Sequence, residues 1–348
     1  MRDSYFPNTE ELAPTELRVI ALGTGRPFLR PAQANTSWLI ELGNGDKFVM
    51  DFGSGSQANF NALEIPPQDV TAYFATHLHA DHVGDFAQIW IASWTGGRSK
   101  PLVIYGPSGP DPKYGIKHFV RCQMDSFAWD IDTRHGLLPE SGAEVEVHEF
   151  DFAQSAVVYD RNGVVIRSFP AIHFYDGPVS YRLEWNGLCF VFSGDTTPSH
   201  FFIDNAKGAD LVVHEASNTL SQMMSRFGFD EKTATGVGAM AHAVPAEVGH
   251  VFNAIKPRHA VIYHFFNDFD TAPEIEREVR LHYQGPLSLA QDFMVFNVTK
   301  ENIRVRMAVV PDRVWPNKSR HAAFRAGSRR ARLTMSRWLA DKQLFQKF

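Results

Sequence analysis

Four side chains that can bind a metal ion lie within six consecutive residues of this sequence: His77, His79, Asp81 and His82. Imidazole and carboxylate groups suit zinc and similar divalent metals. The apolar residues 69–75, which come just before this cluster, predict a buried strand. At this spacing the first two histidines can face one ion together, while Asp81 and His82 turn toward a second. Chance or solvation explains such a cluster poorly, so the sequence predicts a metal site.

Three further ligand candidates, His173, Asp195 and His264, each follow a short apolar stretch that predicts a strand or turn. Polar groups at the ends of neighbouring strands converge on one edge of a sheet. A single histidine in such a place is more often structural. These residues are candidates because they accompany the cluster described above.

The elements that must position these residues alternate between strand and helix over almost the whole chain. Gly43-Asn44-Gly45-Asp46 and Asn186-Gly187 are turn signals that predict two hairpins. Pro245 suits the first turn of a helix that reaches Ile255. Two halves of similar content suggest two sheets packed face to face with helices outside. We predict one domain over residues 1–311 and a basic, helical tail over residues 312–348.

The composition excludes several other classes of protein. The chain has 348 residues, with 34 Lys or Arg against 39 Asp or Glu, and its net charge of -5 argues against a dedicated nucleic-acid binder. Two cysteines, Cys122 and Cys189, are too few for a disulfide framework. No apolar run approaches the roughly 20 residues that span a bilayer, and the first residues lack the apolar core of a signal peptide. We therefore expect a cytoplasmic protein without a membrane partner.

The cluster reads His-x-His-x-Asp-His, and with it the chain resembles the metallo-β-lactamase superfamily over residues 18–300. The resemblance implies a four-layer αββα sandwich with metals at one edge. It implies three ligands for each of two metals: His77, His79 and His173 for the first, and Asp81, His82 and His264 for the second. Asp195 would bridge the two metals. Asp51 matches an early aspartate that orients a ligand histidine.

Several segments resemble the ribonuclease Z-like branch of that superfamily: residues 22–25, residues 102–107 and His214-Glu215-Ala216. His242 lies just before the helix expected at Pro245, where this branch places a catalytic histidine. The resemblance implies that Glu215 supports His242 and that the pair protonates the leaving group. In the mechanism that we expect, Asp81 accepts a proton from the attacking water. A carboxylate beside an imidazole raises the imidazole pKa, which would keep that proton available near neutral pH.

Two departures from that branch argue against tRNA as the substrate. Residues 31–35 match the branch's basic loop poorly, and the long basic arm that grips tRNA is missing. Residues 122–160 instead carry nine Asp or Glu, and such a surface would repel a phosphate backbone. We therefore expect a small-molecule substrate and no nucleic-acid partner.

Other segments resemble the chlorothalonil hydrolytic dehalogenases, which replace an aromatic chlorine by hydroxyl: residues 5–12, 94–98, 176–180, 257–261 and 263–268. Aromatic side chains near the ligands could wall an apolar pocket, and we select Trp94, Tyr175 and Phe266 as its candidates. Tyr175 and Phe266 each lie two residues past a ligand histidine. Packing in the core is the alternative role for such side chains.

From these resemblances we expect a dinuclear hydrolase with two divalent metals, Zn²⁺ first and Mn²⁺ or Fe²⁺ as alternatives. A metal-bound hydroxide would attack a small, aromatic or apolar organic substrate, as in the dehalogenases. Phosphodiesters, sulfate esters and lactones stay open as substrates because they share this chemistry. A non-catalytic metal-binding protein would have lost ligands, and the residues after 311 are too few for the flavin domain of a redox enzyme. A homo-oligomer also stays open.

Overall fold

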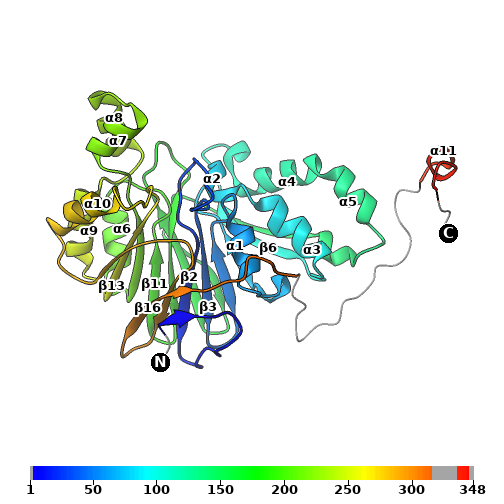
Figure 1. The fold of residues 1–348 in the computed structure, drawn as a ribbon, viewed down its shortest axis with the longest axis horizontal. Coiled ribbons are helices and arrows are strands. Elements are labelled where there is room, and N and C mark those ends of the chain that lie inside the picture. The colour runs from blue at the N-terminus through cyan, green and yellow to red at the C-terminus, as the bar shows by residue number, and fades with distance from the viewer. Residues whose placement is uncertain (1–2, 316–334, 345–348) are drawn as a thin grey trace.

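Two β-sheets pack face to face in the computed structural model, which describes residues 3–315 and 335–344 (Figure 1). The first sheet has nine strands in the order β1-β16-β15-β2-β3-β4-β5-β6-β7, and the second has seven in the order β14-β13-β12-β11-β10-β9-β8. The first sheet consists of β1 (Ser4–Tyr5), β2 (Leu17–Gly23), β3 (Ser37–Leu42), β4 (Lys47–Met50), β5 (Ala72–Phe74), β6 (Leu102–Pro107), β7 (Val145–Phe150), β15 (Met294–Val298) and β16 (Ile303–Ala308). The second consists of β8 (Ala156–Arg161), β9 (Val164–Pro170), β10 (Val179–Trp185), β11 (Leu188–Phe192), β12 (Leu211–Glu215), β13 (His259–Tyr263) and β14 (Leu287–Leu289).

Apolar side chains of both sheets fill the space between them. In β3, Trp38 and Ile40 belong to this central core, whereas Leu39 belongs to the core under the helices of the first sheet. A strand that is covered on both faces needs apolar residues at successive positions, which is the pattern of β3. Across the sheets, the rings of Trp38 and Tyr263 lie 5.8 Å apart, and those of Phe74 and Tyr181 lie 5.4 Å apart.

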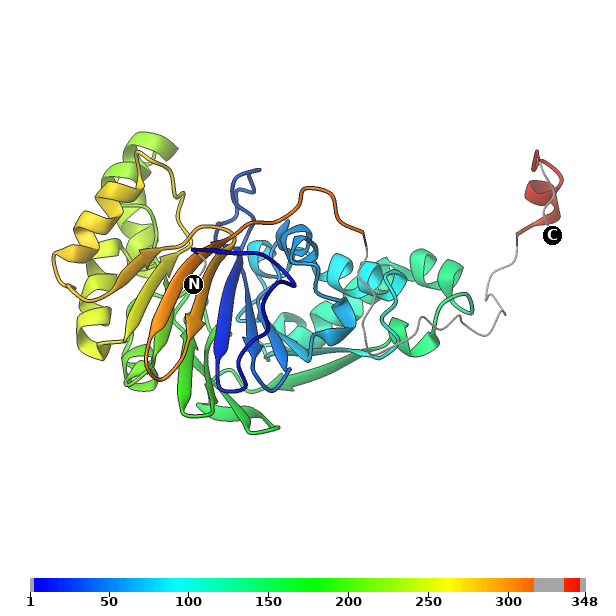
Figure 2. The same cartoon turned by 60° about the horizontal axis from the view of Figure 1, so that its bottom comes forward.

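Helices cover the outer face of each sheet, as Figure 2 shows. The first sheet is covered by α1 (Ser56–Ala62), α2 (Ala80–Val83), α3 (Ser93–Thr95), α4 (Ile116–Ser126) and α5 (Ala128–Arg134), with the short turns η1 (Pro67–Asp69), η2 (Gln88–Ala92), η3 (Pro112–Tyr114) and η4 (Glu140–Ala143). The second sheet is covered by α6 (His200–Ala206), α9 (Pro245–Ile255) and α10 (Ala272–Arg280). The four-layer αββα sandwich is therefore confirmed.

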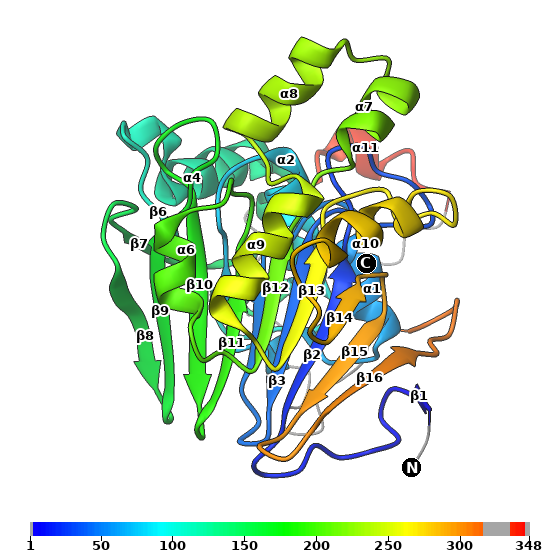
Figure 3. The same ribbon diagram turned by 90° about the vertical axis from the view of Figure 1, so that its left-hand side faces the viewer.

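Two helices, α7 (Leu220–Phe227) and α8 (Glu231–Met240), form a hairpin that projects beyond the ends of the strands (Figure 3). We made no prediction for this segment from the sequence. Each helix begins with a side chain that caps it, because Thr219 accepts from the backbone N–H of Gln222 and Asp230 accepts from that of Thr233. The hairpin ends near the metal ligands, since the N–H of Phe174 donates to the carbonyl of Met240.

Strands from the two ends of residues 1–311 lie in one sheet. Strand β1 pairs with β16, and β2 pairs with β15. This pairing supports our proposal that residues 1–311 form one domain. Of the tail predicted at residues 312–348, the structure describes 312–315 and 335–344, where α11 (Arg337–Ala340) is a helix. The rest of that prediction lies outside the described residues. Among the described residues, no helix is both long enough and apolar enough to cross a bilayer.

The loop that joins β2 to β3 is fixed by one carboxylate. Asp292 accepts hydrogen bonds from the backbone N–H of Thr24 at 3.0 Å and of Ala34 at 2.7 Å, and from the Asn59 amide at 3.1 Å. Burial raises the pKa of Asp292 to about 6, although these donors oppose the shift. The carboxylate is thus ionised above that pH and holds both ends of the loop.

Replacing this carboxylate tests its structural role. We expect Asp292→Ala to lower the free energy of unfolding by about 2–4 kcal/mol at pH 8, because the backbone N–H groups of Thr24 and Ala34 would lose their acceptor. Urea unfolding followed by circular dichroism measures the change. Asp204→Ala, which removes an exposed carboxylate, is the matched control and should change little. Equal unfolding of both variants would contradict the role of Asp292.

Candidate metal centre

Functional side chains follow the carboxyl ends of strands in both sheets. In the first sheet, Asp51 directly follows β4, and His77 lies shortly after the end of β5. In the second sheet, Asp195 follows β11, Glu215 ends β12 and His264 follows β13. Strands β11, β12 and β13 are parallel, so their carboxyl ends meet at one edge. The αββα packing brings the corresponding edge of the first sheet against it.

The structure brings His77, His79, His173 and Asp195 into one group whose ligand atoms all lie within 4.8 Å of one another. Nδ1 of His79 lies 3.0 Å from Nε2 of His77 and 3.0 Å from Nε2 of His173. Burial lowers the pKa of His173 to about 4, and it also lowers the pKa of His77. Neutral imidazoles, the form that binds metals, therefore converge on one point.

A second group contains Asp81, His82, Asp195 and His264, again with ligand atoms within 4.8 Å. Nε2 of His264 lies 3.1 Å from Asp81 Oδ2 and 3.4 Å from Asp195 Oδ2. Burial alone would raise the pKa of Asp195, but the imidazoles of His264 and His82 hold it well below its usual range. Asp195 belongs to both groups, as a bridging ligand would.

Two buried atoms without hydrogen-bond partners indicate that the side chains of this site fit divalent metal ions. His82 Nε2 and Asp195 Oδ1 are buried 3.2 Å apart, yet within the described structure neither atom makes a hydrogen bond. Buried polar atoms normally have partners, and a cation is the partner that a ring nitrogen and a carboxylate oxygen can share. The side chains of the cluster could therefore hold divalent metal ions.

One buried carboxylate orients histidines of both groups. Asp51 Oδ2 accepts from Nδ1 of His82 at 2.7 Å and from the Thr76 hydroxyl at 2.8 Å. The Thr76 hydroxyl in turn accepts from Nδ1 of His77 at 3.0 Å. Both rings thus keep their Nε2 atoms free for a metal. Thr76 was not among our predicted site residues, although it directly precedes the ligand cluster in the sequence.

A glycine in the segment after β11 allows that segment to approach Thr76 closely. Gly194, at φ +59°, lies so close to Thr76 that a Cβ atom would be 2.7 Å from the Thr76 Cβ. The left-handed conformation and the close approach both require glycine here. Asp195 follows directly and so reaches the histidines of the first sheet.

Glu215 and His242 form a pair beside the metal ligands. Glu215 Oε1 lies 3.1 Å from His242 Nδ1 and also accepts from the backbone N–H of Thr196 at 3.1 Å. Burial and the nearby Asp195 carboxylate raise the pKa of Glu215 well above its usual range. Burial lowers the pKa of His242, which differs from the rise we expected, because removing the ring from water outweighs its acidic neighbours.

The three aromatic pocket candidates lie in different surroundings. Trp94 was wrongly selected, because it is fully buried and its indole N–H donates to the Pro139 carbonyl at 2.8 Å. Tyr175 is 84% exposed and lines a cavity of about 190 Å³ beside His77, His79 and His173. Phe266 lines a different groove, next to His264.

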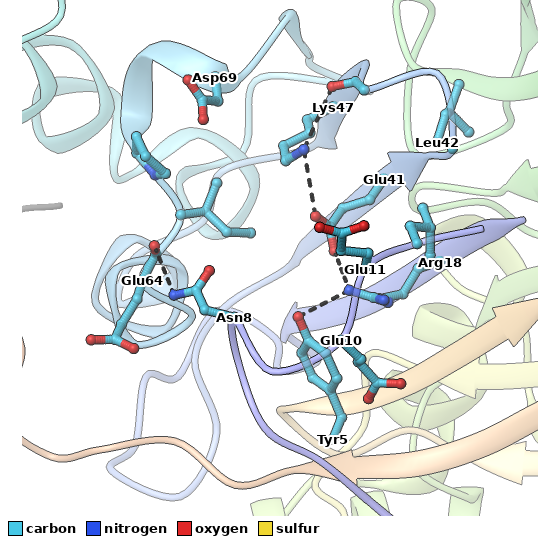
Figure 4. A pocket seen from close by; sticks show the side chains of 15 residues that line it. Tyr5, Asn8, Glu10, Glu11, Arg18, Glu41, Leu42, Lys47, Glu64 and Asp69 are labelled. Carbon is cyan, nitrogen blue, oxygen red and sulfur yellow. Dashed lines mark hydrogen bonds and ion pairs between the residues drawn. The ribbon is translucent and has the colours of Figure 1, made fainter. Parts of the chain in front are cut away.

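A larger cavity of about 540 Å³ lies at the opposite end of the first sheet (Figure 4). There the Arg18 guanidinium lies 3.2 Å from Glu41 and 3.0 Å from the Tyr5 hydroxyl, and Lys47 lies 3.6 Å from Glu41. These cations are paired with acidic or phenolic groups of the chain itself. The metal ligands are at the other end of the strands, so we place the chemistry there.

The sequence profile of the Metallo-beta-lactamase superfamily matches residues 30–228, more than half of the chain. The chain belongs to this superfamily. Ribonuclease Z of Mycobacterium marinum (strain ATCC BAA-535 / M) is 31% identical over 204 residues, which cover 57% of this chain and 70% of that protein. Ribonuclease Z of Mycobacterium bovis (strain BCG / Pasteur 1173P2) is 32% identical over 204 residues, covering 57% and 69%. The chain is a metal-dependent hydrolase of the ribonuclease Z-like branch.

Solved structures agree on the fold. The short form of human tRNase Z superimposes with a TM-score of 0.59 at 19% identity, covering 80% of this chain and 98% of that one. The metallo-β-lactamase fold protein YhfI from Bacillus subtilis gives a TM-score of 0.61 at 16% identity, covering 82% and 100%.

Our expectation of a small-molecule substrate and no nucleic-acid partner is wrong, because the relatives described above carry the name ribonuclease Z. The comparisons give no support to a dehalogenase substrate either. Five of the nine acidic residues of 122–160 fall on α5 or on β7 and β8, the edge strands of the two sheets, and none of the nine is among the candidate ligands. A charge summed over a chain or a segment does not give the charge at a site.

The position of Asp51 generates a prediction about metal affinity. Asp51→Asn keeps the side-chain shape but removes the charged acceptor of His82 and Thr76, so we expect zinc affinity to fall by about 10–100-fold. Competition with a chromophoric chelator measures the affinity, and circular dichroism checks the fold. Asp204→Asn, at an exposed site, is the control. Unchanged zinc affinity in Asp51→Asn would show that Asp51 does not orient the ligands.

Proposed function

We propose that the protein is a dinuclear, zinc-dependent phosphodiester hydrolase that cleaves RNA. The observation that carries this proposal is the Asp195 carboxylate, which lies 3.2 Å from His82 Nε2 in one ligand group and 3.7 Å from His173 Nε2 in the other. One carboxylate within reach of two metal positions suits a pair of ions that act on one phosphate. RNA is the substrate class because relatives named ribonuclease Z are 31–33% identical to the chain.

In this proposal His77, His79 and His173 would hold the first metal, Asp81, His82 and His264 would hold the second, and Asp195 would be shared between them. Five imidazoles with two carboxylates favour zinc, with Mn²⁺ and Fe²⁺ as alternatives. When bound, these metals supply Lewis-acid activation of water and neutralise charge that develops on the phosphate. Burial alone would raise the pKa of Asp81, but His82 and His264 lower it. A carboxylate with a lowered pKa is a weak base. We therefore propose that Asp81 acts as a metal ligand rather than as the proton acceptor.

Glu215 and His242 would protonate the leaving oxygen. The raised pKa of Glu215 lets this carboxyl group retain a proton, and His242 Nδ1 lies 3.1 Å from it. His242 can give a proton from Nε2 to the leaving group while Nδ1 takes one from Glu215. Such a relay leaves the ring neutral at the end of the step, which suits its buried position.

Aryl halides and other small molecules no longer form part of the proposal, because the relatives point to RNA. Cys122 and Cys189 are both free thiols, as a reducing compartment would keep them. A cytoplasmic site of action therefore belongs to the proposal.

A substrate panel tests the reaction class. The zinc-loaded protein is expected to cleave a single-stranded RNA oligonucleotide and bis(4-nitrophenyl) phosphate, with activity lost after dialysis against a chelator. His79→Ala is the negative control, because it removes a ligand of the first metal. Cleavage of an aryl sulfate, a lactone or a chlorinated aromatic, with no action on either phosphodiester, would overturn the proposal.

His242→Ala tests proton delivery. We expect kcat for RNA to fall by about 10²–10⁴-fold, since the ribose oxygen needs a proton to leave. The fall for bis(4-nitrophenyl) phosphate should be much smaller, because 4-nitrophenolate leaves unprotonated. Elemental analysis should find wild-type zinc content in His242→Ala and depleted zinc in His79→Ala. Equal losses on the two substrates would remove His242 from the role of acid.

A further inference from the structure

An aromatic groove of about 390 Å³ lies beside the metal centre, lined by Arg26, Pro27, Phe28, Phe227, Phe229 and Phe266. These residues come from three segments: the loop after β2, the end of α7 with the turn that follows it, and the loop after β13. Phe28 is 71% exposed. None of these side chains has a part in the proposed metal binding or proton transfer.

The segments that form the groove lie next to the metal ligands, through hydrogen bonds and closeness in sequence. The backbone N–H of His264 donates to the Thr24 carbonyl at 2.9 Å, which joins the first and third segments. Phe266 lies two residues beyond His264, and its N–H donates to the Asn218 side chain at 3.2 Å. A group bound in the groove is therefore adjacent to the reacting phosphate.

The rings are arranged edge to face, so they do not cover one another. Phe28 and Phe266 have centroids 6.2 Å apart at 84°, and Phe227 and Phe266 have centroids 5.6 Å apart at 72°. The exposed ring of Phe28 is thus available for stacking with a flat ligand. Stacking of bases on aromatic side chains is the common means of binding single-stranded nucleic acid.

Arg26 provides a cation that is close enough to Glu215, Asp195 and Asp81 to interact with their charges. Its guanidinium carbon lies 5.2 Å from the centroid of the Phe227 ring and 5.8 Å from that of Phe266. Its Nη1 atom is shielded from water and has no hydrogen-bond partner in the described structure. A shielded guanidinium nitrogen without an acceptor is costly, and a phosphate oxygen would satisfy it.

We propose that the groove binds one nucleobase of the RNA substrate, stacked on Phe28, while Arg26 binds the phosphate next to that base. This inference rests on the proposed function and specifies where the strand lies. A purely apolar ligand could fill the groove but would leave Arg26 Nη1 without an acceptor. A base linked to a phosphate satisfies both features.

Equilibrium binding tests the proposal separately from catalysis. Zinc-loaded His242→Ala protein, in which cleavage is slow, is titrated into a fluorescein-labelled RNA oligonucleotide and followed by anisotropy. Adding Phe28→Ala should raise Kd roughly 5- to 150-fold, the loss expected for one stacked base. Adding Phe269→Ala is the matched control, since Phe269 is 93% exposed and does not line the groove. Equal Kd values for the Phe28→Ala and Phe269→Ala proteins would overturn the groove proposal, whether or not the wild type cleaves RNA.

An abasic ribose-phosphate oligomer separates base from phosphate recognition. Phe28→Ala should weaken binding of RNA but not of the abasic oligomer, whereas Arg26→Met should weaken binding of both by roughly 10-fold. Arg26→Met should also reduce the salt dependence of RNA binding. If RNA and the abasic oligomer bind the His242→Ala protein equally well, the groove does not recognise a base. If wild-type protein cleaves no phosphodiester, the proposed function fails, and that result is independent of these Kd values.

Discussion

The buried Asp51 carboxyl group connects the two groups of candidate metal ligands through its hydrogen bonds. It is fully enclosed, and burial raises its pKa, so only its hydrogen bonds make the ionised form tolerable. Those bonds come from His82 and from the backbone and hydroxyl groups of Thr76. His82 and His77 belong to different groups of candidate ligands, and Asp51 reaches the first directly and the second through Thr76. Asp51 itself has φ +57°, a strained conformation for a side-chain-bearing residue, which aims it inward from the end of β4.

The two sheets are joined at the same edge by hydrogen bonds to backbone carbonyls of the first sheet, which keeps the candidate ligands of both sheets close together. The N–H of Val179 donates to the Thr76 carbonyl at 3.0 Å, and the Tyr181 hydroxyl donates to the Ala75 carbonyl at 2.6 Å. These bonds satisfy backbone groups of the first sheet just before its ligand cluster begins. Without them, the segment after β5 would leave buried carbonyls unpaired. The sandwich therefore fixes the distance between ligand groups that lie far apart in the sequence.

Much of the fold and of the ligand set could be predicted from the sequence, because each depends on local patterns. The hairpins at residues 37–50 and 179–192 follow from turn residues between apolar runs, and helix α9 begins at Pro245 as its fixed φ favours. Trp94 could not be placed, because its burial depends on a contact that is distant in sequence: its indole N–H donates to the Pro139 carbonyl. In the α7–α8 hairpin, the second helix contains Gly236 and Gly238, which weaken its helical pattern in the sequence.

Chemistry and specificity are encoded in different ways in this chain. The reaction is set by side chains at strand ends, where the sheet geometry leaves little freedom, and a short motif suffices to reveal them. In the proposed binding mode, the surroundings of the reacting group come from segments near residues 26–28, 227–229 and 266, which meet only in the folded protein. No spacing rule connects Phe28 to Phe227, so a motif that identifies the hydrolase cannot identify its substrate. The folded structure indicates the ligand instead. Arg26 Nη1 lacks a hydrogen-bond acceptor beside exposed aromatic rings, and only a ligand with an acceptor at that place can supply one.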